Sequence, residues 1–319
     1  MRKKKIPLIV AIVAIPLLFL GIFFAESETS KMQQSPSDNK EVSIGQSNPE
    51  SSSFIDNLRE KTFTGGEITI ERTLSTNSNF TSYLISYPSD DLKIYGVMNI
   101  PKGKGHFPLI LLNHGYYNPS TFQSGDGTRS MAEILANKGY LTLASDYRGH
   151  GKSEGEGGGH RPEYAIDVLN LAASAKTIPQ ADTTRIGMWG HSMGGETSLR
   201  AVEINPDIKA LVLWAPTTNR ASHAGTSFRM RSNPNPTSSE QNAAPLDFLS
   251  YIETPISLHQ GLSDTEVDPD SSKSLNNSLR GLGKNIEYFE YQGQDHNFQN
   301  LGWDLISKRT VDFFDKYLK

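Results

Sequence analysis

The stretch that decides the fold runs from residue 185 to residue 204 and reads RIGMWGHSMGGETSLRAVEI. An apolar run of strand type precedes its central Gly-x-Ser-x-Gly pattern, and a run compatible with a helix follows it. A serine on so sharp a strand-to-helix turn adopts a strained backbone that projects its hydroxyl, and glycines flank it because a Cβ atom there would collide with the neighbouring strand and helix. The pattern alone also occurs by chance in glycine-rich turns, but its position favours a nucleophile elbow. We therefore predict that Ser192 is a nucleophile and that the Met193 amide, at a helix N-terminus, stabilises an oxyanion.

Such a nucleophile needs an orienting acid and a histidine base, which follow it along the chain in that order. Asp264 and His296 each follow an apolar run of strand type. Because loops at the carboxyl ends of parallel strands meet at one edge of a sheet, both side chains are expected close to Ser192. His296 is the only histidine after His259, and His259 lies inside a strand-like run where a structural role is expected. The acid has rivals nearby, which are Asp268, Asp270 and Asp295.

A second oxyanion donor is predicted in the loop after another apolar run, residues 108–113. That run breaks at His114-Gly115-Tyr116-Tyr117. A loop in this position supplies a backbone donor, and glycine lets the backbone approach the substrate closely. We predict the amide of Tyr116, with Tyr117 as the alternative; an ordinary strand-ending turn is the competing interpretation.

Several short motifs together resemble those of α/β-hydrolases, and more narrowly of prolyl-oligopeptidase-like and dienelactone-hydrolase-like serine hydrolases. The resemblance implies a catalytic triad of Ser192, Asp264 and His296, with the amides of Met193 and Tyr116 in the oxyanion hole. One departure is Gln260, where relatives more often have a second histidine or an apolar residue; we expect it to lie apart from the catalytic chemistry. The matching segments are residues 96–101, 112–115, 146–155, 190–195, 244–247, 259–264 and 293–296.

The order of the remaining elements predicts an α/β-hydrolase fold with a mostly parallel central sheet and helices on both of its faces. Strand-like runs alternate with helical ones from Leu109 onward, which is typical of parallel strands joined by crossover helices. The polar stretch 217–250 is expected to form a short lid above the nucleophile. Helices are predicted near residues 128–138, 162–177, 194–204, 270–281 and 303–318.

The N-terminal 62 residues are expected to lie outside the catalytic domain, 63–319. A basic cluster precedes residues 6–25, which carry no charge and are long enough to span a bilayer as a helix. We expect residues 1–25 to be a retained membrane anchor, with a cleaved signal peptide as the alternative, and the rest of the chain to be extracytoplasmic. Residues 26–62 are polar and are expected to be a disordered tether.

Composition excludes several classes of function. The net charge is −4 with no basic cluster in the catalytic domain, which argues against a nucleic-acid partner. The chain has no cysteine, and no group of histidines and carboxylates has metal-ligand spacing, so we expect neither metal nor cofactor.

The expected activity is that of a serine hydrolase acting on a small-molecule ester through an acyl-enzyme. A serine peptidase acting on short peptides is the first alternative, although residues 63–319 leave no room for a gating propeller domain. An acyltransferase or thioesterase that uses the same residues is a weaker alternative. A non-catalytic binding protein is another weak alternative, because all three triad residues are present.

Overall fold

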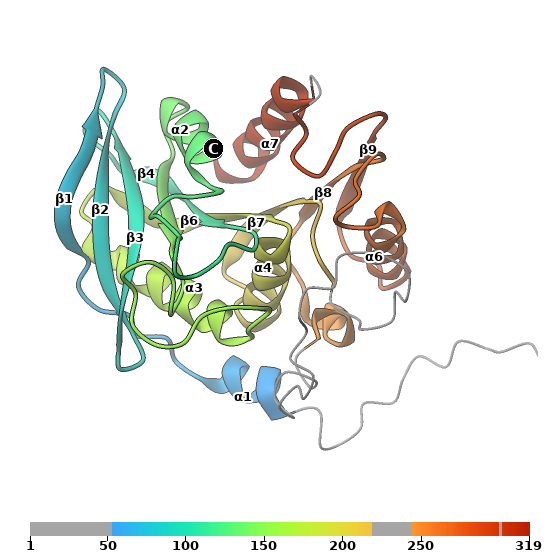
Figure 1. Cartoon of the computed structure of the whole chain (residues 1–319), viewed down its shortest axis with the longest axis horizontal. Coiled ribbons are helices and arrows are strands. Elements are labelled where there is room, and N and C mark those ends of the chain that lie inside the picture. Colours follow the sequence, from blue (N-terminus) through green and yellow to red (C-terminus); the bar gives the residue numbers. More distant parts are fainter. Residues whose placement is uncertain (1–52, 219–243, 300–301) are drawn as a thin grey trace, which may run out of the picture. The chain divides into compact units, whose positions relative to one another are not determined.

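The computed structural model describes residues 53–218, 244–299 and 302–319. Within them, one nine-stranded sheet has the order β1-β2-β3-β5-β4-β6-β7-β8-β9 (Figure 1). The pairs joining β1, β2, β3 and β5 are antiparallel, and every pair from β5 through β4 to β9 is parallel. The predicted mostly parallel sheet is therefore confirmed. The strands are β1 Thr69–Thr76, β2 Phe80–Ser89, β3 Leu92–Pro101, β4 Phe107–Asn113, β5 Leu141–Ser145, β6 Ala181–His191, β7 Ile208–Trp214, β8 Ile256–Gly261 and β9 Ile286–Tyr291.

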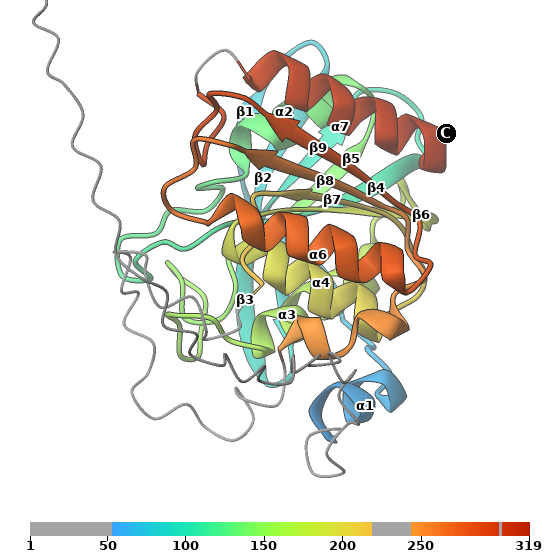
Figure 2. The same cartoon turned by 90° about the vertical axis from the view of Figure 1, so that its right-hand side faces the viewer.

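Helices cover both faces of this sheet, as predicted (Figure 2). Strand β4 shows why, since Leu109 and Leu111 belong to one buried cluster while Ile110 and Leu112 belong to the other. The first cluster packs against α3, α4 and α6, and the second packs against α2 and α7. A strand buried on both faces reads as a continuous apolar run, and β4 does. The helices are α1 Ser53–Glu60, α2 Arg129–Asn137, α3 Glu163–Ser174, α4 Met193–Ile204, α6 Pro269–Gly281 and α7 Trp303–Leu318, with short 3₁₀ turns at Ala175–Thr177, Pro245–Asp247 and Leu249–Tyr251.

Helix α1 corrects the predicted tether, which was expected to remain disordered as far as residue 62. Ile55 is fully buried and Leu58 is 8% exposed, and both join the core on the α4 side. Asp56 accepts a hydrogen bond of 2.8 Å from the Tyr251 hydroxyl, and Arg59 donates to the backbone oxygen of Glu203 in α4. The packed domain therefore includes residues 53–62, because two apolar side chains on one helical face are enough to dock a short helix.

Two other predictions lie outside the described residues. The apolar segment 6–25 is one of them, and most of the expected lid, 219–243, is the other. Among the helices that are described, none is long and apolar enough to cross a membrane.

The glycine-rich stretch after β5 is a loop, and its residue His150 packs among aromatic side chains. His150 is fully buried and stands edge-on to the rings of His114, Phe122 and Tyr164. Tyr147 stacks on His114 with ring centroids 4.2 Å apart. This aromatic cluster fixes the loops after β4 and β5 against each other at the carboxyl end of the sheet.

Candidate active site

Ser192 occupies a sharp turn between β6 and α4, with φ 55° and ψ −122°. A positive φ is uncommon for a residue with a side chain and persists only where the surroundings impose it. Here the Ser192 amide donates to Trp214 O at 3.0 Å, and its carbonyl accepts from the amides of Gly195 and Thr217. A Cβ atom on Gly194 would lie 2.0 Å from Asn113 O, so only glycine fits beside the strand. The elbow predicted from the sequence is therefore present.

Asp264 and His296 are brought together after β8 and β9. His296 Nδ1 lies 2.8 Å from Asp264 Oδ2. The other carboxylate oxygen, Oδ1, accepts from the amides of Glu266 and Val267 at 2.8 and 2.9 Å. Burial opposes ionisation of Asp264, but the bond with His296 and these two amides hold the pKa of its carboxyl below the usual value. An ionised carboxylate only accepts hydrogen bonds, so it places the imidazole proton on Nδ1 and leaves Nε2 available as a base.

Two of the three rival aspartates have structural tasks instead. Asp268 caps α6 by accepting from the amide of Asp270 at 3.0 Å. Asp295 accepts from two amides of its own turn. His259, expected to be structural, is fully buried in β8 and hydrogen-bonds with the Tyr291 hydroxyl at 2.7 Å.

The residue before the nucleophile connects the elbow to the histidine loop. His191 Nε2 lies 2.9 Å from His296 O, and the two imidazole centroids are 4.6 Å apart. The structure shows no hydrogen bond between the Ser192 hydroxyl and the His296 ring. In unliganded enzymes the contact between nucleophile and base is often loose and tightens with substrate bound.

The loop after β4 also reaches the elbow. A Cβ atom on Gly115 would stand 3.2 Å from Ser192 Cβ, so this backbone passes directly beside the nucleophile. Tyr116 follows it and is 44% exposed, whereas Met193 is buried as the first residue of α4. Both backbone segments predicted to form the oxyanion hole thus lie next to Ser192; the choice of Tyr116 over Tyr117 stays a prediction.

Gln260, which was expected to lie apart from the catalytic chemistry, contacts the candidate acid. Its Nε2 donates to Asp264 Oδ2 at 3.0 Å, and its Oε1 accepts from the Ser272 hydroxyl at 2.7 Å. Gln260 is fully buried at the end of β8, four residues before the acid. The available signal was a glutamine near the end of a strand-like run that leads into the candidate acid.

A buried ionic cluster below the elbow was also missed. Glu196, fully buried in the first turn of α4, contacts His160 and pairs with Arg200. Burial opposes its charge, but Arg200 and His160 lower the pKa of Glu196 to about 2. The Thr217 hydroxyl donates to Glu196 at 3.1 Å, and the Thr217 amide donates to Ser192 O. Thr217, which follows β7, therefore connects the ionic cluster to the backbone of the nucleophile. A glutamate and an arginine four residues apart in an apolar helix were its sequence signal.

The described residues contain no group of three or more His, Cys, Asp or Glu side chains that could hold a metal ion.

Comparisons with known proteins agree with the architecture. A family model described as serine aminopeptidase, S33, matches residues 107–238. The acetyl xylan esterase from Paenibacillus sp. R4 superposes with a TM-score of 0.63 at 18% sequence identity, over 83% of this chain and 92% of that one. The chain has the α/β-hydrolase fold. It also superposes on the acylaminoacyl peptidase of Pyrococcus horikoshii, with a TM-score of 0.63 and 20% identity, over 80% of this chain and 50% of that one.

Among curated proteins, an uncharacterised protein encoded in the traX-finO intergenic region of Escherichia coli is 34% identical over 122 residues. The match spans 35% of this chain and 38% of that relative. The chain thus matches well under half the length of this relative.

Proposed function

We propose that this hydrolase cleaves carboxylic esters, with Ser192 as nucleophile, His296 as general base and Asp264 as the residue that orients the histidine. The observation that carries the proposal is the 2.8 Å hydrogen bond between His296 Nδ1 and Asp264 Oδ2, beside a serine held at positive φ. A strained serine on a strand-to-helix turn and a carboxylate-bound histidine on a neighbouring loop are what acyl transfer requires.

The proposed reaction has two halves. His296 Nε2 takes the proton of the Ser192 hydroxyl as Oγ bonds to the carbonyl carbon of the ester. The amides of Met193 and Tyr116 stabilise the tetrahedral oxyanion. Its collapse breaks the bond to the alcohol oxygen, which takes the proton from His296. Water then attacks the acyl-serine, His296 again takes and returns a proton, and the carboxylic acid leaves with Ser192 regenerated.

A peptide substrate is the second candidate, because the matching family model is described as a serine aminopeptidase. This chain aligns with 92% of the acetyl xylan esterase and with 50% of the acylaminoacyl peptidase. Fold likeness by itself assigns no substrate, so the two must be separated by assay.

The experiment uses the full-length chain and a fluorophosphonate probe, followed by turnover of p-nitrophenyl butyrate and of an aminoacyl p-nitroanilide. We expect labelling of the wild type and of Ser120→Ala, which removes an exposed loop serine. We expect none in Ser192→Ala, whose turnover should fall by about 10⁶-fold, and a loss of about 10⁴-fold in Asp264→Asn. Labelling that persists in Ser192→Ala would refute the assignment, and anilide turnover exceeding ester turnover would favour the peptidase.

We further propose that the hydrolase acts outside the cytoplasm, on the membrane surface. The support is the basic cluster Arg2–Lys5 followed by the uncharged segment 6–25. Alkaline phosphatase fused after Lys319 should be active in intact bacteria, and the protein should stay in the membrane fraction after carbonate washing. Recovery in the cytosol would refute the proposal, and recovery in the medium would indicate a cleaved signal peptide.

A further inference from the structure

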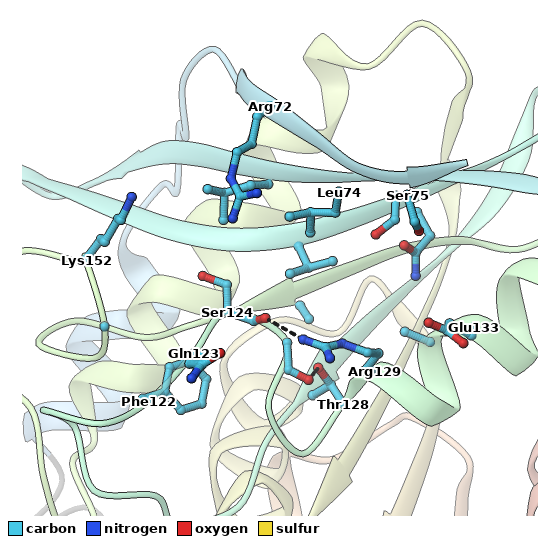
Figure 3. A pocket seen from close by; sticks show the side chains of 18 residues that line it. Arg72, Leu74, Ser75, Phe122, Gln123, Ser124, Thr128, Arg129, Glu133 and Lys152 are labelled. Atoms are coloured by element: carbon cyan, nitrogen blue, oxygen red, sulfur yellow. Dashed lines mark hydrogen bonds between the residues drawn. The ribbon is translucent and has the colours of Figure 1, made fainter. Parts of the chain in front are cut away.

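A cleft of about 530 Å³ lies on the α2 side of the sheet, and no residue of the candidate triad lines it. One wall is formed by β1, β2 and β3, and the other by α2 and residues 122–125 (Figure 3). Phe122, which lines the cleft, belongs to the aromatic cluster around His114. The cleft is therefore a separate concavity, within the size range of small-molecule sites.

Strand β1 forms part of one wall of this cleft. All eight of its residues are exposed, so it adds nothing to the buried core. Its pairing with β2 shifts register between Ile70 and Arg72 and again between Thr73 and Ser75. Each shift places an extra residue in β1, and such bulges bend a strand and increase its twist. Two bulges within eight residues curve β1 relative to its neighbour, and Arg72, Leu74 and Ser75 line the cleft.

Cross-strand pairing makes a continuous floor. Arg72 pairs with Leu84, Leu84 pairs with Val97, and Val97 pairs with Ala144 of β5. Residues that pair directly point to the same face of a sheet, so Leu84, Val97 and Ala144 form one apolar row beneath Arg72. All four line the cleft.

A second row is polar and contains an unsatisfied group. Ser75 pairs with Ser82, and Ser82 pairs with Asn99. Asn99 is only 3% exposed and its Oδ1 has no hydrogen-bond partner among the described residues. A buried amide oxygen without a partner is destabilising, and a hydrogen-bond donor such as a water molecule held in the cleft would relieve it.

The rim of the cleft is cationic. Figure 3 shows Arg72 hanging from β1, Arg129 reaching from the first turn of α2 towards Ser124, and Lys152 at the far end. Arg129 bonds only to the Ser124 carbonyl, at 3.4 Å. None of these three cations makes an ion pair with a described residue, and Glu133 is the one carboxylate lining the cleft. Three cations against one carboxylate favour an anion.

We propose that this cleft is a second binding site, distinct from the Ser192 site, for an organic carboxylate with an apolar body. The carboxylate lies among Arg72, Arg129 and Lys152, and the aliphatic or aromatic body lies on the row formed by Leu84 and Val97. Neither half suffices alone: a small inorganic anion leaves the apolar floor in water, and a neutral molecule leaves the cations unpaired.

Octanoate is the probe, titrated calorimetrically into the full-length chain carrying Ser192→Ala, so that no chemistry intervenes. Arg72→Gln and Lys152→Gln, both at exposed positions, should each weaken octanoate binding about three- to tenfold. Glu133→Gln should strengthen it, because it removes the opposing charge. Lys273→Gln, which removes an exposed lysine from α6, is the matched control and should change nothing.

Two further ligands separate the halves of the proposal. Octan-1-ol keeps the body without the charge, and inorganic phosphate keeps the charge without the body; both should bind at least about tenfold more weakly than octanoate. Absence of octanoate binding would overturn the proposal. So would equal affinity in all four charge variants, an alcohol that binds as tightly as the acid, or phosphate that binds as tightly as octanoate. Since the readout is binding to a Ser192→Ala chain, the result is independent of whether the hydrolase cleaves esters.

Discussion

Replacing Gln260 with leucine tests whether this residue tunes the histidine or only fills space. Asp264 accepts four hydrogen bonds: from His296 Nδ1, from Gln260 Nε2 and from two backbone amides. Gln260→Leu removes one of them and also orphans the buried hydroxyl of Ser272, which donates to Gln260. A hydrogen bond to a charged group contributes about 1.5–3 kcal/mol, and the orphaned hydroxyl adds its own desolvation. We expect the free energy of unfolding to fall by about 2–4 kcal/mol.

The same change should alter catalysis in a way that a purely structural role would not. With one donor fewer, the Asp264 carboxylate is more basic and stabilises the protonated form of His296 more strongly. The acidic limb of kcat/KM for p-nitrophenyl butyrate should therefore move to higher pH, so the variant loses activity before the wild type as the pH falls.

Ser272→Ala is the matched control, because it breaks the far end of the same chain of hydrogen bonds and leaves the Gln260–Asp264 bond in place. It should lower the unfolding free energy while leaving the pH profile where the wild type has it. If Gln260→Leu is destabilised but its acidic limb coincides with those of wild type and Ser272→Ala, the reasoning about Asp264 is refuted.

Three further outcomes can be checked by urea unfolding. Burial raises the pKa of Asp146 to about 7, so the protonated carboxyl contributes fully to stability below about pH 4 and this contribution is lost as the pH rises to 7. The unfolding free energy of Asp146→Asn should therefore gain up to about 4 kcal/mol on that of the wild type between pH 4 and pH 8. Parallel curves of unfolding free energy against pH for the two proteins would contradict this. Glu196→Gln removes the buried charge that pairs with Arg200, which is 3% exposed, and should cost about 3–5 kcal/mol; a loss below about 1 kcal/mol would show that this ion pair is dispensable. Gly194→Ala places a Cβ atom 2.0 Å from a backbone oxygen of β4 and should unfold or inactivate the protein. Gly281→Ala places its Cβ atom in open space and should be neutral or stabilising. Equal unfolding free energies for the two variants would contradict the steric argument.

The sequence sufficed for features that follow from local pattern. The helical spacing of apolar residues predicted a helix over 303–318, and α7 spans Trp303–Leu318. The elbow could be predicted because its steric demands, glycines beside a serine between strand and helix, are all local. The Asp264–His296 pair was reachable too, since chain order and strand ends restrict which side chains can meet at the carboxyl edge of a parallel sheet.

What the sequence did not reveal depends on partners far away along the chain. Helix α1 has only Ile55 and Leu58 as buried apolar residues in a polar stretch, and its main partner, α4, lies well over a hundred residues later. The contact between His160 and Glu196 likewise joins two residues that lie 36 positions apart in the sequence. The cleft could not be predicted, because its shape depends on the two bulges in β1 and no residue pattern around Arg72 predicts a bulge.

Strand β1 is also the outer edge of the sheet, and its irregularity affects how molecules of this protein meet in solution. A straight edge strand offers evenly spaced amide and carbonyl groups on which a strand of another molecule can pair, and this is a common start of aggregation. The two register shifts interrupt that spacing within eight residues, and Glu71 and Arg72 add charge at the first of them. At the opposite edge, β9 carries Glu287 and Glu290. Both ends of the nine-stranded sheet thus resist edge-to-edge growth, which helps to keep a domain with such a large sheet from polymerising when it is concentrated.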